Sequence, residues 1–193
     1  MADETKLADQ VRARLGPRPL VLVGLMGCGK SSVGKRLAAK LQLPFVDADE
    51  EIEKVAAKTI SEIFADHGED YFRNGERKVI ARLLDSGPQV LATGGGAFIN
   101  SETRQRIKAR AISIWLKADL AVLMRRVSKR DSRPLLKTSN PEVVMSALMA
   151  ARYPVYAEAD ITVESRDLPH DIMVLEVLSA LLVHPGLDEP PSV

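Results

Sequence analysis

The stretch LVLVGLMGCGKSSVGKRLAAKL, residues 20–41, decides the fold of this chain. It runs from an apolar segment through a glycine-rich turn into a segment whose apolar residues have helical spacing. The turn, GLMGCGKS at residues 24–31, matches the pattern G-x-x-x-x-G-K-[ST] between a strand and a helix. Its glycines allow successive N–H groups to point at phosphate oxygens, and the helix adds the positive end of its dipole. A purely structural glycine turn is the alternative, but the stretch predicts a nucleoside triphosphate site.

Several residues of this phosphate-binding loop (P-loop, residues 24–31) have an expected contact. We expect Lys30 to reach the β- and γ-phosphates and Ser31 to offer its hydroxyl to Mg²⁺. Cys28 is most simply a small loop residue, although its place beside Lys30 at a helix N-terminus also fits a reactive thiol. The predicted nucleotide contacts of this segment are Gly27, Cys28, Gly29, Lys30, Ser31 and Ser32. The motif does not say which molecule receives the phosphoryl group.

Length and composition indicate one globular domain. The 193 residues are enough for one sizeable core and few for two, and 46% of them are hydrophobic. The 27 basic and 26 acidic side chains nearly cancel, which gives no reason to expect nucleic acid or an anionic membrane as a partner. A single cysteine excludes an intramolecular disulfide, and no segment reads as a signal peptide or membrane span. We therefore expect a cytoplasmic protein.

The chain divides into three parts. Residues 1–18 read as a polar N-terminal extension, a helix that frays and ends at Gly16-Pro17. Residues 19–183 read as the single domain, and the proline-rich and glycine-rich tail from His184 to residue 193 reads as disordered.

Strands and helices alternate within the domain. Apolar runs typical of strands buried on both faces occur at residues 20–23, 45–46, 90–92, 112–116 and 161–163. Helices are predicted between these strands, and their starts can be read from the sequence. Thr59 and Glu62 predict a capping box, Asn100 or Ser101 is predicted to cap the next helix, and Asn140 is predicted to cap a helix whose first turn holds a proline. This alternation predicts a parallel sheet with helices on both faces, and a ligand at the carboxyl ends of the strands.

Three further patterns fall where an acceptor would bind. Asp47 and Asp49 follow the second strand on the same side of an extended segment, and they suit a magnesium ion and a substrate hydroxyl. Solvated acids that cap the next helix are the alternative. The segment Phe72-Arg73-Asn74-Gly75-Glu76 is predicted to start a helix, and Gly94-Gly95-Gly96 leaves the third strand. Three glycines allow a ligand close to the backbone, although they also suit a flexible turn.

The chain resembles the shikimate kinase family over about residues 19–183. Six patterns carry the resemblance in order and at fitting intervals: the P-loop, Asp47-x-Asp49, Phe72-Arg73 with Glu76, Gly94-Gly95-Gly96, Arg133-Pro134-Leu135-Leu136 and Arg152-x-x-x-Tyr156. The resemblance implies a P-loop NTPase fold of the nucleoside monophosphate kinase-like type. This is a three-layer α/β sandwich whose five-stranded parallel sheet has the order 2-3-1-4-5.

The resemblance also implies roles for residues. Those implied to hold shikimate are Asp49, Arg73, Gly94, Gly95, Gly96 and Arg152, with the two arginines on its carboxylate. A guanidinium presents a fork of donors that matches a carboxylate, although a single arginine taken alone is as well explained by a surface ion pair. Asp47 is implied to join the magnesium shell through water, and Glu76 to orient Arg73.

A polar, cation-rich segment, RRVSKRDSRPLLKTSN at residues 125–140, reads as a solvated loop. The resemblance implies that about residues 126–140 form a lid whose Arg133 reaches the phosphates, where kinases need a cation as charge spreads onto the transferring group. It further implies that adenine lies between Arg126 and Pro169.

The resulting expectation is an ATP-dependent and magnesium-dependent kinase that phosphorylates the 3-hydroxyl of shikimate, on the route to chorismate and the aromatic amino acids. Lys30, Asp49 and Arg133 are its expected catalytic residues, and a monomer is its expected state. The alternatives are a kinase for another small hydroxy acid such as gluconate and a nucleotide-binding regulator without catalysis. Trp115 reads as a core residue, and the three histidines show no metal-ligand spacing.

Overall fold

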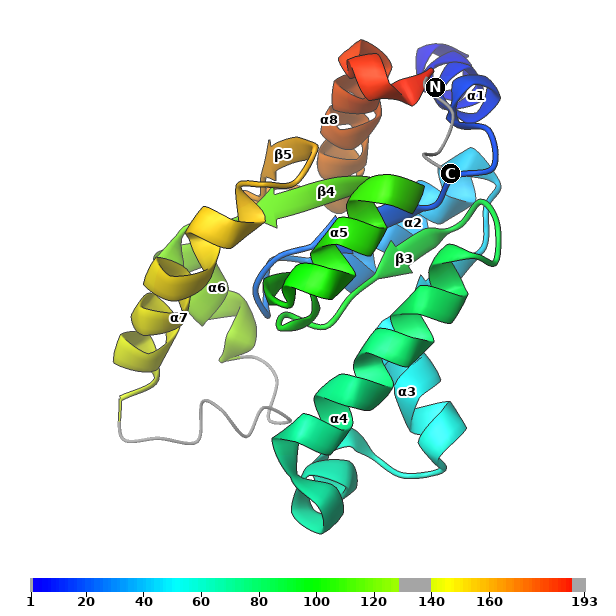
Figure 1. Ribbon diagram of the computed structural model, residues 1–193. Coiled ribbons are helices and arrows are strands. Elements are labelled where there is room, and N and C mark those ends of the chain that lie inside the picture. The colour runs from blue at the N-terminus through cyan, green and yellow to red at the C-terminus, as the bar shows by residue number, and fades with distance from the viewer. Residues whose placement is uncertain (1, 129–139, 189–193) are drawn as a thin grey trace.

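A computed structural model describes residues 2–128 and 140–188 and contains one five-stranded parallel sheet (Figure 1). Its strands are β1 (Leu20–Val23), β2 (Phe45–Asp47), β3 (Val90–Ala92), β4 (Ile112–Lys117) and β5 (Ile161–Glu164). They lie in the order β2-β3-β1-β4-β5, and Leu20 is in register with Val90 on one side and Ile112 on the other. The predicted fold class, strand order and strand positions are confirmed, with differences of one residue at three strand ends.

Helices flank the sheet on both faces, which gives the three layers. The helices are α1 (Ala2–Leu15), α2 (Lys30–Leu41), α3 (Ala48–Ala56), α4 (Ile60–Leu84), α5 (Ser101–Arg110), α6 (Leu120–Val127), α7 (Pro141–Tyr156) and α8 (His170–Val183), with short 3₁₀ turns η1 (Ala97–Ile99) and η3 (Pro185–Leu187). Helices α2 and α8 pack on each other behind the sheet, and α5 crosses in front of it (Figure 1). Among the described residues, no helix combines the length and apolar character that a membrane crossing needs.

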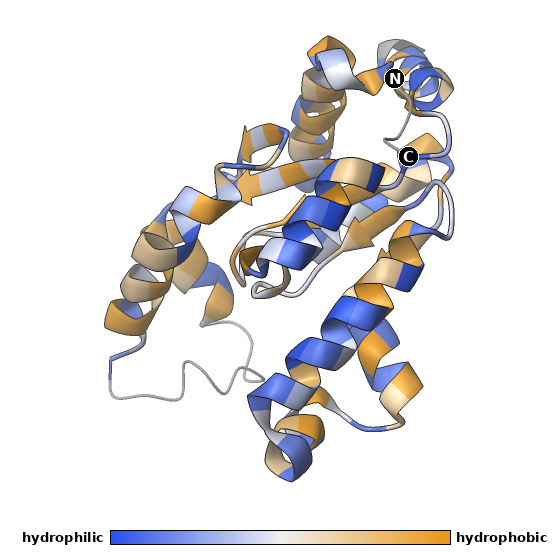
Figure 2. Cartoon of the chain, viewed as in Figure 1, coloured by the Kyte–Doolittle hydropathy of each residue, from blue (hydrophilic) through white to orange (hydrophobic). Residues whose placement is uncertain are grey.

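Hydropathy follows these layers. Hydrophilic residues predominate along α5 and much of α4, whereas β3 and β4 are mostly hydrophobic (Figure 2). The three central strands β1, β3 and β4 are buried on both faces, as predicted. The same prediction is wrong for the two edge strands. Strand β2 is only half-buried. Strand β5 alternates buried and exposed residues, because successive side chains point to opposite faces of the sheet and one of these faces is open to solvent at β5.

Side-chain caps fix where the helices begin. The predicted capping box is present, with the Thr59 side chain accepting from the N–H of Glu62 and the Glu62 side chain accepting from the N–H of Thr59. Asn100 caps α5 by accepting from Thr103 N at 2.9 Å, and Asn140 caps α7 by accepting from Val143 N at 3.3 Å. These three predictions from the sequence are confirmed.

Two local predictions at the acceptor site need correction. Helix α4 begins at Ile60 after its capping box and is interrupted at Gly68, where φ is 80° and ψ is 179°, so Phe72 lies in the first turn of the second part of α4 and does not begin it. Asp49 does not lie on an extended segment either. The Asp47 side chain accepts a hydrogen bond from Asp49 N at 3.1 Å and caps α3, which begins directly after β2. For Asp47, the alternative of an acid that caps the next helix is therefore correct.

The N-terminal helix α1 does not fray but packs on the body of the protein. It lies against α8 and α2, with Ala8, Val11 and Leu15 almost completely buried. These residues recur on one face of the helix, so the polar segment carries an apolar stripe that requires a partner.

The C-terminal tail is also ordered as far as Asp188. Leu187 is fully buried, and Arg14 forms a two-pronged ion pair with Asp188, at 2.7 and 2.6 Å. Arg18 donates to the carbonyls of Gly186 and Leu187 at 2.6 and 2.5 Å. The prediction of disorder is therefore wrong for residues 184–188, because η3 packs against α1, whereas residues 189–193 lie outside the described residues.

Candidate active site

The P-loop joins β1 to α2 in a conformation that requires glycine. Gly24, Gly27 and Gly29 have φ angles of 135°, 84° and 102°. A Cβ atom on Gly24 would lie 2.9 Å from Leu116 O, and one on Gly27 would lie 2.8 Å from a methyl group of Val127. Gly29 is also the N-cap of α2 and offers no side-chain acceptor. The first N–H groups of α2 are therefore left to bind a ligand, which suits an anion.

Lys30 lies over this loop. Its Nζ donates to Gly24 O at 2.7 Å and to Leu25 O at 3.0 Å, and it lies 3.7 Å from Cys28 Sγ. Cys28 is only 1% exposed, so its side chain points into the protein and not toward a ligand. Ser31 and Ser32 follow in the first turn of α2 and are partly exposed.

Ser31 and Asp47 form the candidate magnesium site. Ser31 Oγ donates to Asp47 Oδ2 at 2.9 Å, so one hydroxyl and one carboxylate lie together beside the P-loop. Mg²⁺ prefers oxygen ligands and keeps several waters, and it commonly takes one or two protein oxygens together with substrate phosphates. The pair therefore fits the donor set that a nucleotide-bound Mg²⁺ needs.

Arg126 connects the P-loop to the loop between β5 and α8. Its guanidinium donates to the carbonyls of Gly27 and Cys28 at 3.3 and 3.4 Å, and to Ser165 Oγ at 2.9 Å. The buried Ser165 in turn donates to Cys28 O at 2.7 Å. Pro169, the exposed N-cap of α8, follows in the same loop. Arg126 thus contacts both the P-loop and the loop that leads to Pro169, whereas Ser165 carries no motif and was not predicted.

The triple glycine is surrounded by charged side chains. A Cβ atom on each glycine would approach one of them: 2.7 Å from Asp49 Oδ1 at Gly94, 3.6 Å from Arg152 Nη1 at Gly95, and 2.5 Å from Arg73 Nη1 at Gly96. The Gly95 position also lies 3.6 Å from Gly24 O of the P-loop. The structure therefore brings the predicted substrate residues together from three helices, α3, α4 and α7, next to the phosphate site. An added methyl group at Gly94 or Gly96 would therefore displace the Asp49 carboxylate or the Arg73 guanidinium from its place beside the turn.

Asp49 is an unusual carboxyl group. Burial, together with the nearby charges of Asp47 and Glu76, raises the pKa of Asp49 from 3.8 to about 6, against the opposing charge of Lys30. A carboxylate with a raised pKa is a better proton acceptor than an ordinary one, and it remains ionised near neutral pH.

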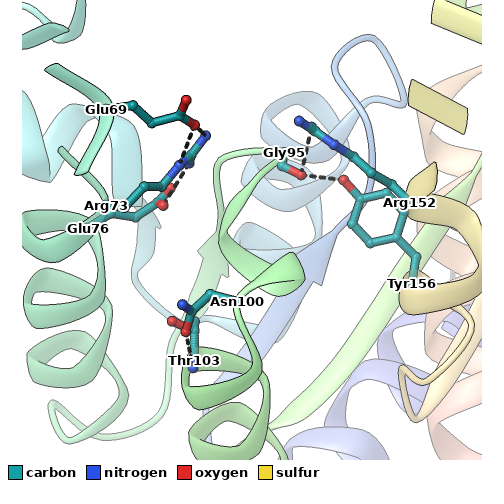
Figure 3. A network of polar contacts seen from close by, with 8 residues as sticks. All are labelled: Glu69, Arg73, Glu76, Gly95, Asn100, Thr103, Arg152 and Tyr156. Carbon is teal, nitrogen blue, oxygen red and sulfur yellow. Dashed lines mark hydrogen bonds and ion pairs between the residues drawn. The ribbon is translucent and has the colours of Figure 1, made fainter. Parts of the chain in front are cut away.

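Arg73 is held by two glutamates of its own helix (Figure 3). Its Nη1 pairs with Glu76 at 2.8 Å, and its Nη2 pairs with Glu69 at 3.2 Å. The Glu76 side chain is 3% exposed, and burial raises the pKa of its carboxyl group despite the ion pair with Arg73. Glu76 therefore fixes the direction of the guanidinium, since leaving either partner buried without the other would be costly.

Arg152 approaches from the opposite side, in the last turns of α7. Its Nη1 donates to Gly95 O at 3.2 Å, and in the part of the chain that the structure describes no carboxylate lies within ion-pair distance of it. The buried hydroxyl of Tyr156 donates to the same carbonyl (Figure 3). Sequence reasoning assigned Tyr156 no role, although its position is fixed by the Arg152-x-x-x-Tyr156 pattern.

Two further predictions concern Trp115 and the lid. Trp115 is 5% exposed and packs against Tyr153 and Tyr156, so its prediction as a core residue is confirmed. Arg133 and most of the predicted lid, residues 129–139, lie outside the described residues.

The fold and the site together define a class of protein. The five-stranded parallel sheet has this strand order, the P-loop follows its central strand, and an acceptor site lies beside the loop. These features are those of a P-loop phosphotransferase of the nucleoside monophosphate kinase-like type. The family model described as shikimate kinase matches residues 26–182. The chain belongs to the shikimate kinase family.

Individual relatives agree with this assignment. A shikimate kinase from Bradyrhizobium diazoefficiens is 59% identical over 90% of this chain and 84% of the relative, and one from Rhodopseudomonas palustris is 59% identical over 89% and 85%. Among solved structures, a shikimate kinase from Acinetobacter baumannii in complex with shikimate has a TM-score of 0.85 at 35% identity, over 91% of this chain and 98% of that one.

Proposed function

We propose that this protein transfers the γ-phosphoryl group of ATP to the 3-hydroxyl of shikimate, giving shikimate 3-phosphate on the route to chorismate and the aromatic amino acids. The observation that carries the proposal is the arrangement of Asp49, Arg152 and Arg73, each against one glycine of the triple-glycine turn beside the P-loop. Two cations and one carboxyl group around a bare backbone suit a small ring that carries one carboxylate and several hydroxyls.

The nucleotide binds at the P-loop in this proposal. The N–H groups of the P-loop and of the first turn of α2, from Gly27 to Ser32, hold the phosphates, and Lys30 exchanges its contacts with Gly24 O and Leu25 O for phosphate oxygens. Adenine lies between Arg126 and Pro169. Arg133 adds a cation at the transferring group and stays a prediction from the sequence.

Ser31 and Asp47 hold Mg²⁺ with the nucleotide, Ser31 directly and Asp47 through water. The ion neutralises phosphate charge when it is bound. The hydrogen bond between Ser31 Oγ and Asp47 Oδ2 at 2.9 Å keeps both oxygens in place beforehand.

Arg73 and Arg152 bind the substrate carboxylate from two sides, and the N–H groups of the triple-glycine turn contact the ring substituents. Asp49 accepts a hydrogen bond from the 3-hydroxyl and receives its proton as the hydroxyl oxygen attacks the γ-phosphorus. The bond from that phosphorus to the β–γ bridging oxygen breaks, and ADP leaves. Because its pKa is raised to about 6, Asp49 holds this proton more readily than an ordinary carboxylate.

The setting of the reaction is part of the proposal. A net charge of +1 offers no broad basic surface, which supports small molecules as the partners in place of nucleic acid or membrane. We propose a monomer that works in the cytoplasm.

A coupled assay of ADP release with MgATP tests the assignment, with shikimate, gluconate or no acceptor. Release with shikimate alone is the expected result. Release with gluconate alone would identify a kinase for another hydroxy acid, and ATP binding without turnover on either acceptor would identify a regulator.

The Arg152→Lys variant tests the acceptor site in the same assay. Because lysine lacks the planar fork, the KM for shikimate should increase at least about 10-fold while the KM for ATP changes less than about twofold. Arg110→Lys, at an exposed position at the end of α5, is the matched control and should behave as wild type. Equal loss of both affinities in Arg152→Lys would show that Arg152 is misplaced.

A further inference from the structure

Tyr156 places a hydroxyl at the centre of the acceptor site without any access to solvent. It lies at the end of α7 and is 0% exposed, and its hydroxyl donates to Gly95 O. Arg152, one turn earlier on α7, donates to the same oxygen through Nη1 at 3.2 Å (Figure 3). One backbone carbonyl therefore ties together a buried phenol and the arginine that faces the substrate.

The phenol ring has little freedom to move away from this carbonyl. Its centroid lies 5.9 Å from that of Trp115 and 6.5 Å from that of Phe98, and all three rings are buried. Burial also raises the pKa of Tyr156, so its hydroxyl keeps its proton and remains a donor across the physiological range. The buried hydroxyl would lose this hydrogen bond at a cost, because no water reaches it to replace the carbonyl.

Gly95 needs this support because neither it nor its neighbours Gly94 and Gly96 carries a side chain that could anchor the turn. A peptide unit is planar, so the direction of the Gly95 carbonyl also sets the direction of the Gly96 N–H. The Gly96 position faces Arg73, and the Gly95 position faces Arg152. The orientation of one peptide plane thus affects contacts on both sides of the substrate.

We propose that Tyr156 is a positioning residue of the acceptor site: its hydroxyl holds the Gly95 carbonyl and thereby aims the Arg152 guanidinium and the Gly95–Gly96 peptide at the carboxylate of the substrate. The proposal rests on the proposed function, because it takes Arg152 and the triple-glycine turn as binding residues. It adds a residue that does not itself touch substrate.

Tyr153 provides a matched control on the same helix. It lies one turn before Tyr156, and its ring packs edge-on against Trp115 with centroids 4.9 Å apart. Its hydroxyl also donates to a backbone carbonyl, that of Ala118, which follows β4 and does not belong to the glycine turn. Tyr153→Phe therefore removes the same chemical group from the same cluster while leaving Gly95 untouched.

The experiment compares Tyr156→Phe with Tyr153→Phe and wild type in steady-state kinetics and thermal unfolding. Both variants should lose a similar amount in Tm, because each removes one hydrogen bond from a tyrosine hydroxyl to a backbone carbonyl. Only Tyr156→Phe should increase the KM for shikimate, by about 10-fold, with the KM for ATP changed less than about twofold. A KM for shikimate equal to that of wild type, or an equal increase in both variants, would overturn the proposal.

A double-mutant cycle with Arg152→Ala shows whether Tyr156 acts through Arg152. If it does, adding Tyr156→Phe to Arg152→Ala should change the KM for shikimate less than about twofold further, whereas independent effects would multiply. Multiplied effects would overturn the part of the proposal that has Tyr156 aim the Arg152 guanidinium. Wild-type protein that releases no ADP with shikimate would refute the proposed function instead, so the two failures are distinguishable.

A measurement on wild-type protein covers the case in which Tyr156→Phe does not fold. In protein labelled with ¹³C at the tyrosine Cζ, the resonance of Tyr156 should shift when shikimate is added, while that of Tyr153 should not. The chain has three tyrosines, and the spectra of Tyr153→Phe and Tyr71→Phe assign their three signals. A Tyr156 resonance that shikimate leaves unchanged would contradict a coupling between this hydroxyl and the binding residues.

Discussion

Replacing Asp49 by asparagine should make the protein more stable and less active at the same pH. Burial and the charges of Asp47 and Glu76 raise the pKa of Asp49 from 3.8 to about 6. At 1.36 kcal/mol per pKa unit, holding this carboxylate ionised reduces the free energy of unfolding by up to roughly 3 kcal/mol. Asp49→Asn removes the charge and keeps the shape, so it should recover much of that free energy.

The sign of the pH dependence follows from the raised pKa. The folded protein binds the Asp49 proton more tightly than the unfolded chain does, so the destabilisation is fully present above about pH 6 and disappears as the pH falls toward about 4. The stability gained by Asp49→Asn should therefore be greatest near about pH 7.5 and fall to roughly half of that near about pH 5.

Urea unfolding at these two pH values measures the effect, and ADP release with shikimate measures the activity. Turnover of Asp49→Asn should fall about 100-fold or more, because the variant cannot accept the proton of the hydroxyl. The control is Glu50→Gln, the exposed acid next to it in α3, which should change stability by less than about 0.5 kcal/mol. An asparagine variant that is less stable than wild type at the higher pH, or a gain that does not change with pH, would refute the reasoning.

Other substitutions separate the parts of the site. Lys30→Met should retain the far-UV circular dichroism of wild type and lower turnover about 100-fold to 1,000-fold, and full activity would contradict its role. Gly96→Ala should raise the KM for shikimate at least about 10-fold and leave the KM for ATP unchanged, because its Cβ atom would lie 2.5 Å from Arg73 Nη1. Unchanged kinetics would show that the turn can move to accommodate the methyl group. Gly75→Ala should raise the free energy of unfolding by about 0.5–1 kcal/mol in urea, because Gly75 lies inside α4 with nothing within 4 Å of an added Cβ atom, and a loss of stability would contradict this.

The fold could be predicted from the sequence because its signals are local. Strands β1 and β3 coincide with the apolar runs at residues 20–23 and 90–92, and the capping residues mark the starts of α4, α5 and α7. The strand order required the family resemblance, since five buried runs are compatible with several orders. Ordering of the tail could not be predicted, because it depends on Leu187 finding a partner surface on a helix at the other end of the chain.

Motifs in the sequence predicted most residues of the site, whereas roles that depend only on tertiary contacts could not be predicted. Asp49, Arg73 and Arg152 stand in recognisable patterns, and the structure places them around one turn. Tyr156 and Ser165 act through hydrogen bonds to Gly95 and Cys28, which are 61 and 137 positions away in the sequence. No local spacing signals a contact of that range. The sequence placed Tyr156 in a pattern without a role and gave no signal for Ser165, so the contacts of both residues became visible only in the three-dimensional structure.

The pairing of α1 with η3 has a consequence for biosynthesis. The apolar stripe of α1 is completed by α8 and by residues 186–188, so α1 cannot pack completely until these much later residues have been synthesised. At about 5–20 residues per second this delay is roughly 10–30 s, during which Val11 and Leu15 are exposed on the nascent chain. Native closure of this domain is therefore a late step of its synthesis, and until that step the apolar stripe of α1 lacks its partner surface.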